Sequence, residues 1–313
     1  MKINKSLNFS LQLIFSVVVL WWLTQKLGAK DIAHTFSRMS LPVIGGCVLL
    51  YLVAQMLSVW RWASISKMFG FRGEFSKYNS LYFLGMFYNI FLPTGYGGDV
   101  IKIFYQAPDR SPSSRTLSTL TILLDRFMGF IALLLIGGLA SWGVTKELGV
   151  YGAIMSWGFV VCVIVGFAFL RPLSYWSKLP RKFRFIFLTI RAKGFKLFPV
   201  AVISFVIQLL NVAIYAWLFH SLGAEISFLG VCVGYSLVTI ATLLPVSVGG
   251  LGVRESGWAA LMIPFGRVPE VGVTAGLMYF FVQTLCSLFG LVPFFTLKHE
   301  KDHQRTQNPR QKP

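Results

Sequence analysis

The sequence predicts an all-α polytopic membrane protein with six transmembrane helices and two re-entrant helical hairpins. Three observations lead to this fold class. First, 55% of the 313 residues are hydrophobic and only 13% are charged. Second, long apolar runs recur, each near the ~20 residues that a helix needs to cross the hydrocarbon core. Third, two further apolar stretches are each interrupted by a proline and a pair of glycines, a pattern that indicates a broken helix.

Six apolar runs are long enough to span the bilayer, and they cover residues 8–25, 42–61, 118–142, 151–170, 198–219 and 271–297. The first run follows two lysines, as a signal peptide would, but no small-x-small cleavage site comes after it. We therefore expect it to remain as the first helix. Residues 1–297 are predicted to form a single transmembrane domain, and the polar residues 298–313 a disordered basic cytoplasmic tail.

Residues 79–106 and 229–265 are apolar on both sides of a Leu-Pro-x-x-x-Gly-Gly centre. Proline removes a backbone donor, and paired glycines allow backbone angles that other residues avoid. Irregular backbone survives at membrane depth only where protein or water satisfies its polar groups. Each stretch is therefore predicted to be a re-entrant helix, turn and helix. The predicted hairpin tips contain Pro93, Gly97, Gly98, Pro245, Gly249, Gly250 and Gly252.

The two hairpins are related by an offset of 152 residues, which also brings Lys102 onto Arg254. The same offset places the second span on the fifth and the third on the sixth, whereas the first span meets the fourth only loosely. The chain therefore divides into two repeats, about 1–150 and 151–297. Because each repeat crosses the membrane three times, the second is inverted relative to the first, as in many transporters.

The distribution of basic residues predicts the orientation. Of the 29 Lys and Arg residues, 22 lie on the side that holds both termini and 5 on the other side. By the positive-inside rule, both termini face the cytoplasm. Counting either hairpin as two full spans gives the same loop assignment, so the depth of the hairpins stays open. We expect a multi-pass protein of the bacterial cytoplasmic (inner) membrane.

Arg254 and Lys102 are the candidate ligands of a lipid phosphate. Each lies in or near the first turn of a helix that restarts after a glycine pair, where free backbone N–H groups favour an anion. An arginine in a membrane segment is costly unless it is paired or functional, so a structural ion pair is the alternative for Arg254. Asp99 and Glu255 are expected to balance charge or gate the site, and Asp99 alternatively to cap its helix.

Several other polar residues are secondary candidates. Asp125 is expected to pair with a loop cation and Arg126 to reach the head groups, while Asn89 either lines a cavity or ties helices together. The basic and aromatic segment 181–193 favours an interfacial helix on anionic lipid over a nucleic-acid site. The cysteines and histidines have no metal-ligand spacing, and no nucleotide-binding G-x-x-x-x-G-K-[ST] is present, so neither a metal nor another cofactor is predicted.

The motifs N-I-F-L-P-T-G-Y-G-G-D at 89–99 and L-P-V-S-V-G-G-L-G-V-R-E at 244–255 resemble the flippase-like membrane family named after the transmembrane region of lysylphosphatidylglycerol synthase. The resemblance extends over essentially the whole chain in the order of its spans. It implies a domain that moves lipid between leaflets. In the full-length synthases such a domain moves the aminoacylated phospholipid after a soluble domain has made it. This chain departs by lacking that soluble domain, so lysyl transfer is not implied.

The sequence therefore favours a flippase that moves a phospholipid or lipid-linked head group between leaflets, and it shows no catalytic constellation. Its partners would be membrane lipids, namely an anionic phospholipid or a lipid-linked phosphate, with a homo-oligomer or a lipid-biosynthetic partner left open. The alternative is a membrane-embedded enzyme or accessory subunit that modifies a lipid head group. A purely structural scaffold is disfavoured, because it gives no reason for charged hairpin tips. The cargo stays open.

Overall fold

A computed structural model describes isolated positions before residue 39 and then residues 39–91, 97–107, 112–144, 156–161, 163–164, 181–244, 247 and 249–296. The elements within these residues are α3 (Leu41–Met68), α4 (Phe75–Phe91), α5 (Gly97–Gln106), α6 (Pro112–Gly143), α8 (Arg181–Ser221), α9 (Phe228–Thr242), α10 (Val253–Met262), α11 (Pro269–Ser287) and the short 3₁₀ turn η1 (Leu288–Gly290). The described part of the chain is helical and contains no strand, so the predicted all-α class is confirmed there.

Four helices are long and apolar enough to cross a membrane, and they cover Leu41–Met68, Ser114–Gly143, Phe195–Ser221 and Pro269–Thr296. They coincide with the second, third, fifth and sixth predicted spans. Most of the first and fourth predicted spans, and the tail 298–313, lie outside the described residues. The chain thus has the apolar helices of a multi-pass membrane protein.

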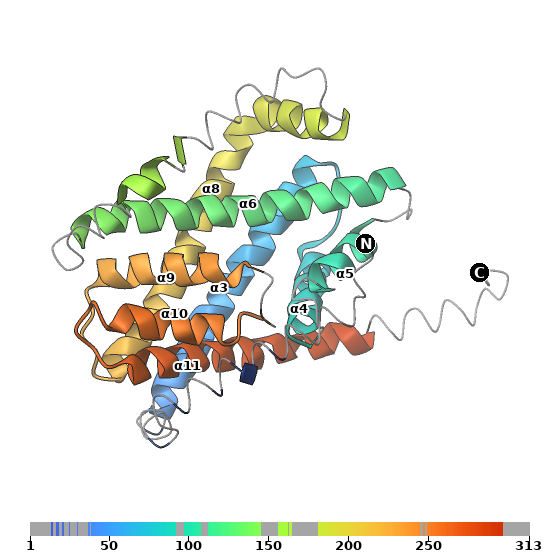
Figure 1. Ribbon diagram of the computed structural model, residues 1–313. Helices are drawn as coiled ribbons and strands as arrows, with labels where there is room; N and C mark the ends of the chain where they lie inside the picture. Colours follow the sequence, from blue (N-terminus) through green and yellow to red (C-terminus); the bar gives the residue numbers. More distant parts are fainter. Residues whose placement is uncertain are drawn as a thin grey trace.

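The helix α8 is longer than the sequence analysis predicted. The basic segment 181–193, for which an interfacial helix was predicted, forms the first part of α8, which runs continuously from Arg181 into the apolar span. Pro199 lies inside this helix. Figure 1 shows the first part of α8 at an angle to the rest, and a proline bends a helix because it removes one hydrogen bond and crowds the preceding turn.

Two pairs of short helices lie where the hairpins were predicted: α4 with α5, and α9 with α10. A helix was predicted to restart after each glycine pair; α10 does so at Val253, whereas α5 already begins at Gly97 and includes its glycine pair. Gly252 is the N-cap residue of α10, with a φ of 85°, a left-handed angle that favours glycine. Pro93 and Pro245, the predicted tip prolines, lie outside the described residues.

The helices pack in pairs that recur between the two repeats. At the centre, α3 packs against α8, its counterpart. The remaining contacts come in matching pairs: α4–α5 with α9–α10, α5–α6 with α10–α11, and α6–α9 with α11–α4. Figure 1 shows α6, α9, α10 and α11 side by side, with α3 and α8 crossing them obliquely.

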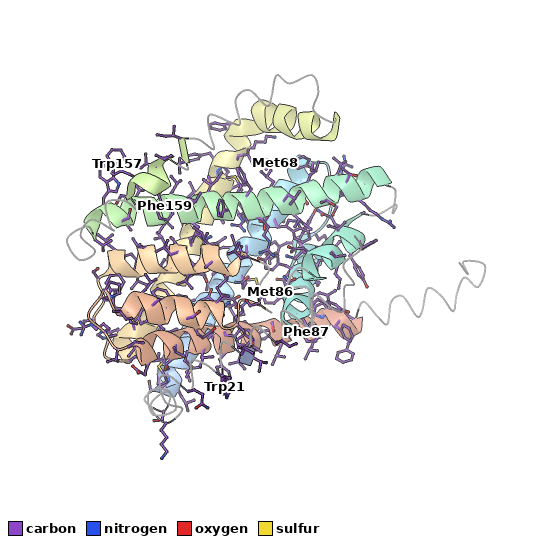
Figure 2. All side chains as sticks on the ribbon, viewed as in Figure 1. Trp21, Met68, Met86, Phe87, Trp157 and Phe159 are labelled. Carbon is purple, nitrogen blue, oxygen red and sulfur yellow. The ribbon has the colours of Figure 1, made fainter. Side chains whose placement is uncertain are left out.

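Aromatic side chains fill the contacts between helices. In one buried group, Tyr215 of α8 stacks on Tyr279 of α11 at 4.6 Å and lies 4.8 Å from the ring of Trp258 in α10. On the other side of the bundle, Phe87 of α4 approaches Phe294 at 6.0 Å, and Figure 2 shows Phe87 beside the helix that continues α11. These contacts hold both short-helix pairs against the long helices.

Glycines bring backbones together at two places, one in each half of the chain. Gly98 of α5 lies against the backbone of Gly85 in α4, so closely that a Cβ on Gly98 would overlap the Gly85 carbonyl. In the second half, a Cβ on Gly272 of α11 would lie 2.6 Å from the carbonyl carbon of Trp258 in α10. Only glycine fits such contacts, which position the short helices.

Replacing Gly98 with alanine should therefore destabilise the protein, by about 1–3 kcal/mol or more, because the new methyl group overpacks the contact with α4. The measurement is the thermal unfolding of the detergent-purified Gly98→Ala variant. Gly45→Ala is the matched control, since nothing lies within 4 Å of a Cβ placed there. Equal melting temperatures for the Gly98→Ala variant and the unmodified protein would contradict the close contact.

Candidate functional site

A buried cluster of charges lies at the start of α5. Arg126 of α6 donates to Asp99 through Nη2, which is 3.1 Å and 3.0 Å from the two carboxylate oxygens, and through Nε at 3.2 Å. Lys102 Nζ lies 3.6 Å from the same carboxylate. Lys102 is only 5% exposed, whereas the Arg126 side chain is 52% exposed. Two cations therefore share one carboxylate, and we call these three residues the first cation cluster.

Two aromatic rings and an amide support the first cation cluster. Lys102 Nζ lies 3.9 Å from the ring centroid of Tyr82 and 5.4 Å from that of Trp62, so its charge faces their π-electrons. Asn89 of α4 accepts a hydrogen bond from the N–H of Gly98 at 2.8 Å. This bond satisfies a free donor of the α5 N-terminus and ties the two short helices together.

A second buried ion pair adjoins the cluster through the backbone of α6. Asp125, the neighbour of Arg126, accepts a hydrogen bond from Arg61 Nε at 2.7 Å, and Arg61 Nη1 donates to Ser204 of α8 at 3.2 Å. The partner of Asp125 is thus Arg61, in the interior of the protein. Since this contact joins α3, α6 and α8 and both partners are buried, we assign the pair a structural role.

Arg254 is the counterpart of Lys102 in the second half of the chain, and it is the second residue of α10. It is 8% exposed, and its Nη2 makes only long contacts of 3.4 Å, to the carbonyl of Gly249 and to Gln283 Oε1. Within the described residues, its buried Nη1 has no hydrogen-bond partner. Its guanidinium lies 5.3 Å from the ring of Tyr279 and 5.8 Å from that of Phe280. The cation is buried and incompletely satisfied.

Glu255 does not neutralise Arg254. Its Oε2 accepts a hydrogen bond from the N–H of Gly252 at 2.6 Å, so this carboxylate caps its own helix. Before the cap, Gly249 and Gly250 have positive φ angles of 61° and 81°. The hydroxyl of Ser247, in the same break between α9 and α10, is buried without a partner among the described residues. A guanidinium and a hydroxyl therefore remain available in one glycine-rich break, which we call the Arg254 site.

A polar row on α8 lies between the Arg254 site and the Arg61–Asp125 pair. Ser204, Gln208 and Asn211 share one face of the helix, at the i, i+4 and i+7 spacing. Gln208 accepts from the hydroxyl of Tyr235 at 3.0 Å and donates to the carbonyl of Gly129 at 2.8 Å. Asn211 accepts from the hydroxyl of Tyr279 at 2.7 Å. Both amides therefore join helices.

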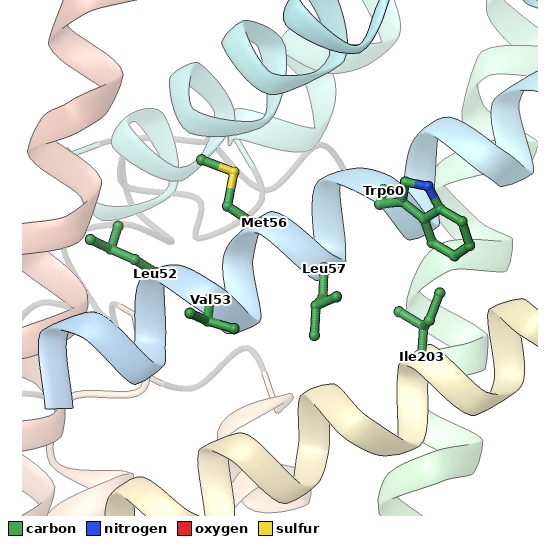
Figure 3. Close-up of a pocket in the computed structure, with 6 residues that line it drawn as sticks. All are labelled: Leu52, Val53, Met56, Leu57, Trp60 and Ile203. Carbon is green, nitrogen blue, oxygen red and sulfur yellow. The ribbon is translucent and has the colours of Figure 1, made fainter. Parts of the chain in front are cut away.

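An apolar groove with a volume of about 530 Å³ lies on α3 and α8, separate from the charged groups. Figure 3 shows the six side chains that line it: Leu52, Val53, Met56, Leu57, Trp60 and Ile203. None of these side chains is charged, so the groove is not the candidate site. The candidate site consists of the charged groups at the starts of α5 and α10.

The arrangement suits an anion. Arginine forms two-point hydrogen bonds to phosphate, and the first turn of a helix adds backbone donors and partial positive charge. No group of three or more metal-ligating side chains occurs in the described part of the chain. At the Arg254 site, Arg254 Nη1 and the Ser247 hydroxyl are unpartnered donors among the described residues, and Glu255 Oε1 is an unpartnered acceptor beside them.

The predicted second span ended at Arg61, and sequence reasoning did not single out Trp62, Tyr82, Ser247 or Tyr279. The helix α3 continues to Met68, so Arg61 lies well within the helix and inside the bundle. Its position between two tryptophans was the available signal, because a basic residue flanked by large aromatic rings is often packed. Nothing in the sequence distinguishes Tyr279 from the other tyrosines.

Comparison with known proteins identifies the family. Residues 9–290 match the family described as the lysylphosphatidylglycerol synthase TM region. A UPF0104 membrane protein of Pyrococcus horikoshii is 22% identical over 309 residues, which cover 86% of this chain and 91% of the relative. The family match extends over most of the chain and agrees with the apolar helices described above. This multi-pass membrane protein therefore belongs to the lysylphosphatidylglycerol synthase TM region family.

Proposed function

We propose that this chain moves a lipid between the two leaflets of the bacterial cytoplasmic membrane and binds the phosphate of the lipid through Arg254 and Lys102. The observation that carries the proposal is the state of Arg254. A buried guanidinium without a carboxylate partner is costly in an apolar interior, because the lost hydration is not replaced. A lipid phosphate would supply the missing acceptor oxygens at Nη1.

The family relationship supports a role in lipid handling, since the family takes its name from an enzyme of phospholipid synthesis. The chemistry of the Arg254 site narrows that role. The unpartnered guanidinium nitrogen of Arg254 is a hydrogen-bond donor, which can hold a phosphate without attacking it. We therefore favour translocation over modification of the head group.

We further propose that the two repeats are inverted and that α4–α5 and α9–α10 enter the membrane from opposite faces, with both termini in the cytoplasm. The matched helix contacts support this arrangement, since each contact of one half has a counterpart in the other. A two-fold axis through the α3–α8 contact would relate them. The two short-helix pairs would then present one cation from each side of the membrane, as in transporters with broken helices.

The first test follows leaflet exchange of fluorescent phosphatidylglycerol in proteoliposomes. The unmodified protein should accelerate exchange over empty liposomes, and Arg254→Gln should slow it at least about tenfold, because losing a hydrogen bond to a charged group costs about 1.5–3 kcal/mol. Arg72→Gln is the matched control, since Arg72 is exposed between α3 and α4. Exchange at the rate of empty liposomes, across several anionic head groups, would overturn the proposed function.

A lysine at position 254 separates charge from geometry. Arg254→Lys keeps the positive charge but loses the planar fork that grips two phosphate oxygens. We expect a rate between those of the unmodified protein and Arg254→Gln, in the same exchange assay. A rate for Arg254→Lys equal to that of the unmodified protein would show that charge alone suffices and that two-point binding is not used.

A further inference from the structure

We propose that Asp99 acts as an internal substitute for the lipid phosphate, occupying the first cation cluster until a phosphate displaces it. This inference rests on the proposed function and adds a regulatory element to it. The two cation sites would then differ in kind. The first is filled by a carboxylate of the protein itself, and the second is open to ligand.

The contacts of Asp99 are those that a bound phosphate would make. Arg126 donates to both carboxylate oxygens through two nitrogens, from Nη2 at 3.1 Å and from Nε at 3.2 Å, in a two-point geometry that guanidinium groups also use for phosphate. Lys102 adds a second cation at 3.6 Å. Asp99 lies in the first turn of α5, where backbone donors favour any anion. A carboxylate thus stands in the place suited to a phosphate.

The Arg254 site shows how a cation is left when no carboxylate pairs with it as Asp99 does in the first cation cluster. Glu255 turns to the N–H of Gly252 and leaves Arg254 unneutralised, with Nη1 unpartnered among the described residues. Asp99 instead points at both of its cations. The difference arises because Asp99 follows Gly98 directly and is three residues before Lys102, one helical turn, whereas Glu255 is adjacent to Arg254 and faces away from it.

The first cation cluster is also accessible from outside the bundle. The Arg126 side chain is 52% exposed, so a ligand can reach the guanidinium from outside the bundle. Trp62 is 1% exposed, and its Nε1 has no hydrogen-bond partner within the described residues, although its ring lies 5.4 Å from Lys102 Nζ. A spare buried donor beside a cation is an additional group that an incoming phosphate could engage.

The competition predicts that removing the Asp99 charge strengthens binding. With Asp99 present, the three residues of the cluster have a net charge of +1, and a phosphate must first break the existing ion pair. In Asp99→Asn both cations become available. We expect phosphate to bind the first cluster about tenfold more tightly in this variant, a change that corresponds to about 1.4 kcal/mol.

The experiment measures binding by calorimetry to the full chain in detergent. Arg254→Gln serves as the background, because it removes the second site from the titration. The probes are dioctanoyl phosphatidylglycerol and inorganic phosphate. Glu225→Gln is the matched control, since it removes one negative charge from an exposed loop. Asp99→Ser repeats the test with a different neutral side chain, and thermal unfolding verifies that each variant is folded.

A second comparison separates competition from a general change of charge. Arg126→Gln should weaken phosphate binding only slightly while Asp99 is present, because Arg126 already forms its hydrogen bonds with Asp99. In the Asp99→Asn background the same change should weaken binding about tenfold or more, since Arg126 would then hold the phosphate directly. Such dependence of one substitution on the other is the expected signature of competition.

Tightening with Asp99→Asn or Asp99→Ser and not with Glu225→Gln supports the proposal. Tightening for the lipid alone identifies a lipid head group as the ligand, and equal tightening for both probes identifies phosphate itself. Unchanged or weaker binding in folded Asp99 variants overturns the proposal, even where Arg254-dependent binding in the otherwise unmodified protein remains. Absence of that Arg254-dependent binding would instead overturn the proposed function.

Discussion

The rest of the structure depends on how an apolar helix bundle holds buried positive charge. Moving a charge out of water is costly unless hydrogen bonds or an opposite charge replace its hydration. This protein meets the requirement in three ways. Arg61 forms a tight pair with Asp125, Lys102 shares Asp99 with Arg126, and Arg254 has only long contacts and aromatic neighbours. The Arg61–Asp125 pair joins two helices, whereas Arg254 can still form hydrogen bonds to a ligand.

The glycines are a consequence of this requirement. A cation can sit at the start of a short helix only if the preceding chain turns sharply and the helix approaches its neighbours closely. Gly252 permits the turn before α10, and Gly98 permits the contact between α5 and α4. The long helices then need only apolar faces to pack around the short ones. The glycines therefore determine both the backbone geometry and the position of the cations.

Much of this was predictable from the sequence, and the reasons are local. Apolar length determines a span, so four predicted spans reappear as helices. A proline followed closely by a glycine pair favours a break in an apolar stretch, so both pairs of short helices were predicted. Contacts between residues that are far apart in the sequence were not predictable. The pairing of Arg61 with Asp125 depends on how α3 and α6 cross, and the cap formed by Glu255 depends on a rotamer, neither of which a repeat offset specifies.

The central claim, that Arg254 binds a lipid phosphate, is tested most directly by a distance measurement in a lipid bilayer. Solid-state NMR can detect dipolar coupling between the phosphorus of phosphatidylglycerol and nitrogen-15 in arginine side chains. The account predicts a coupling at hydrogen-bond range that disappears in Arg254→Gln and persists in Arg72→Gln. A coupling pattern unchanged by Arg254→Gln would show that no phosphate is held there and would contradict the account.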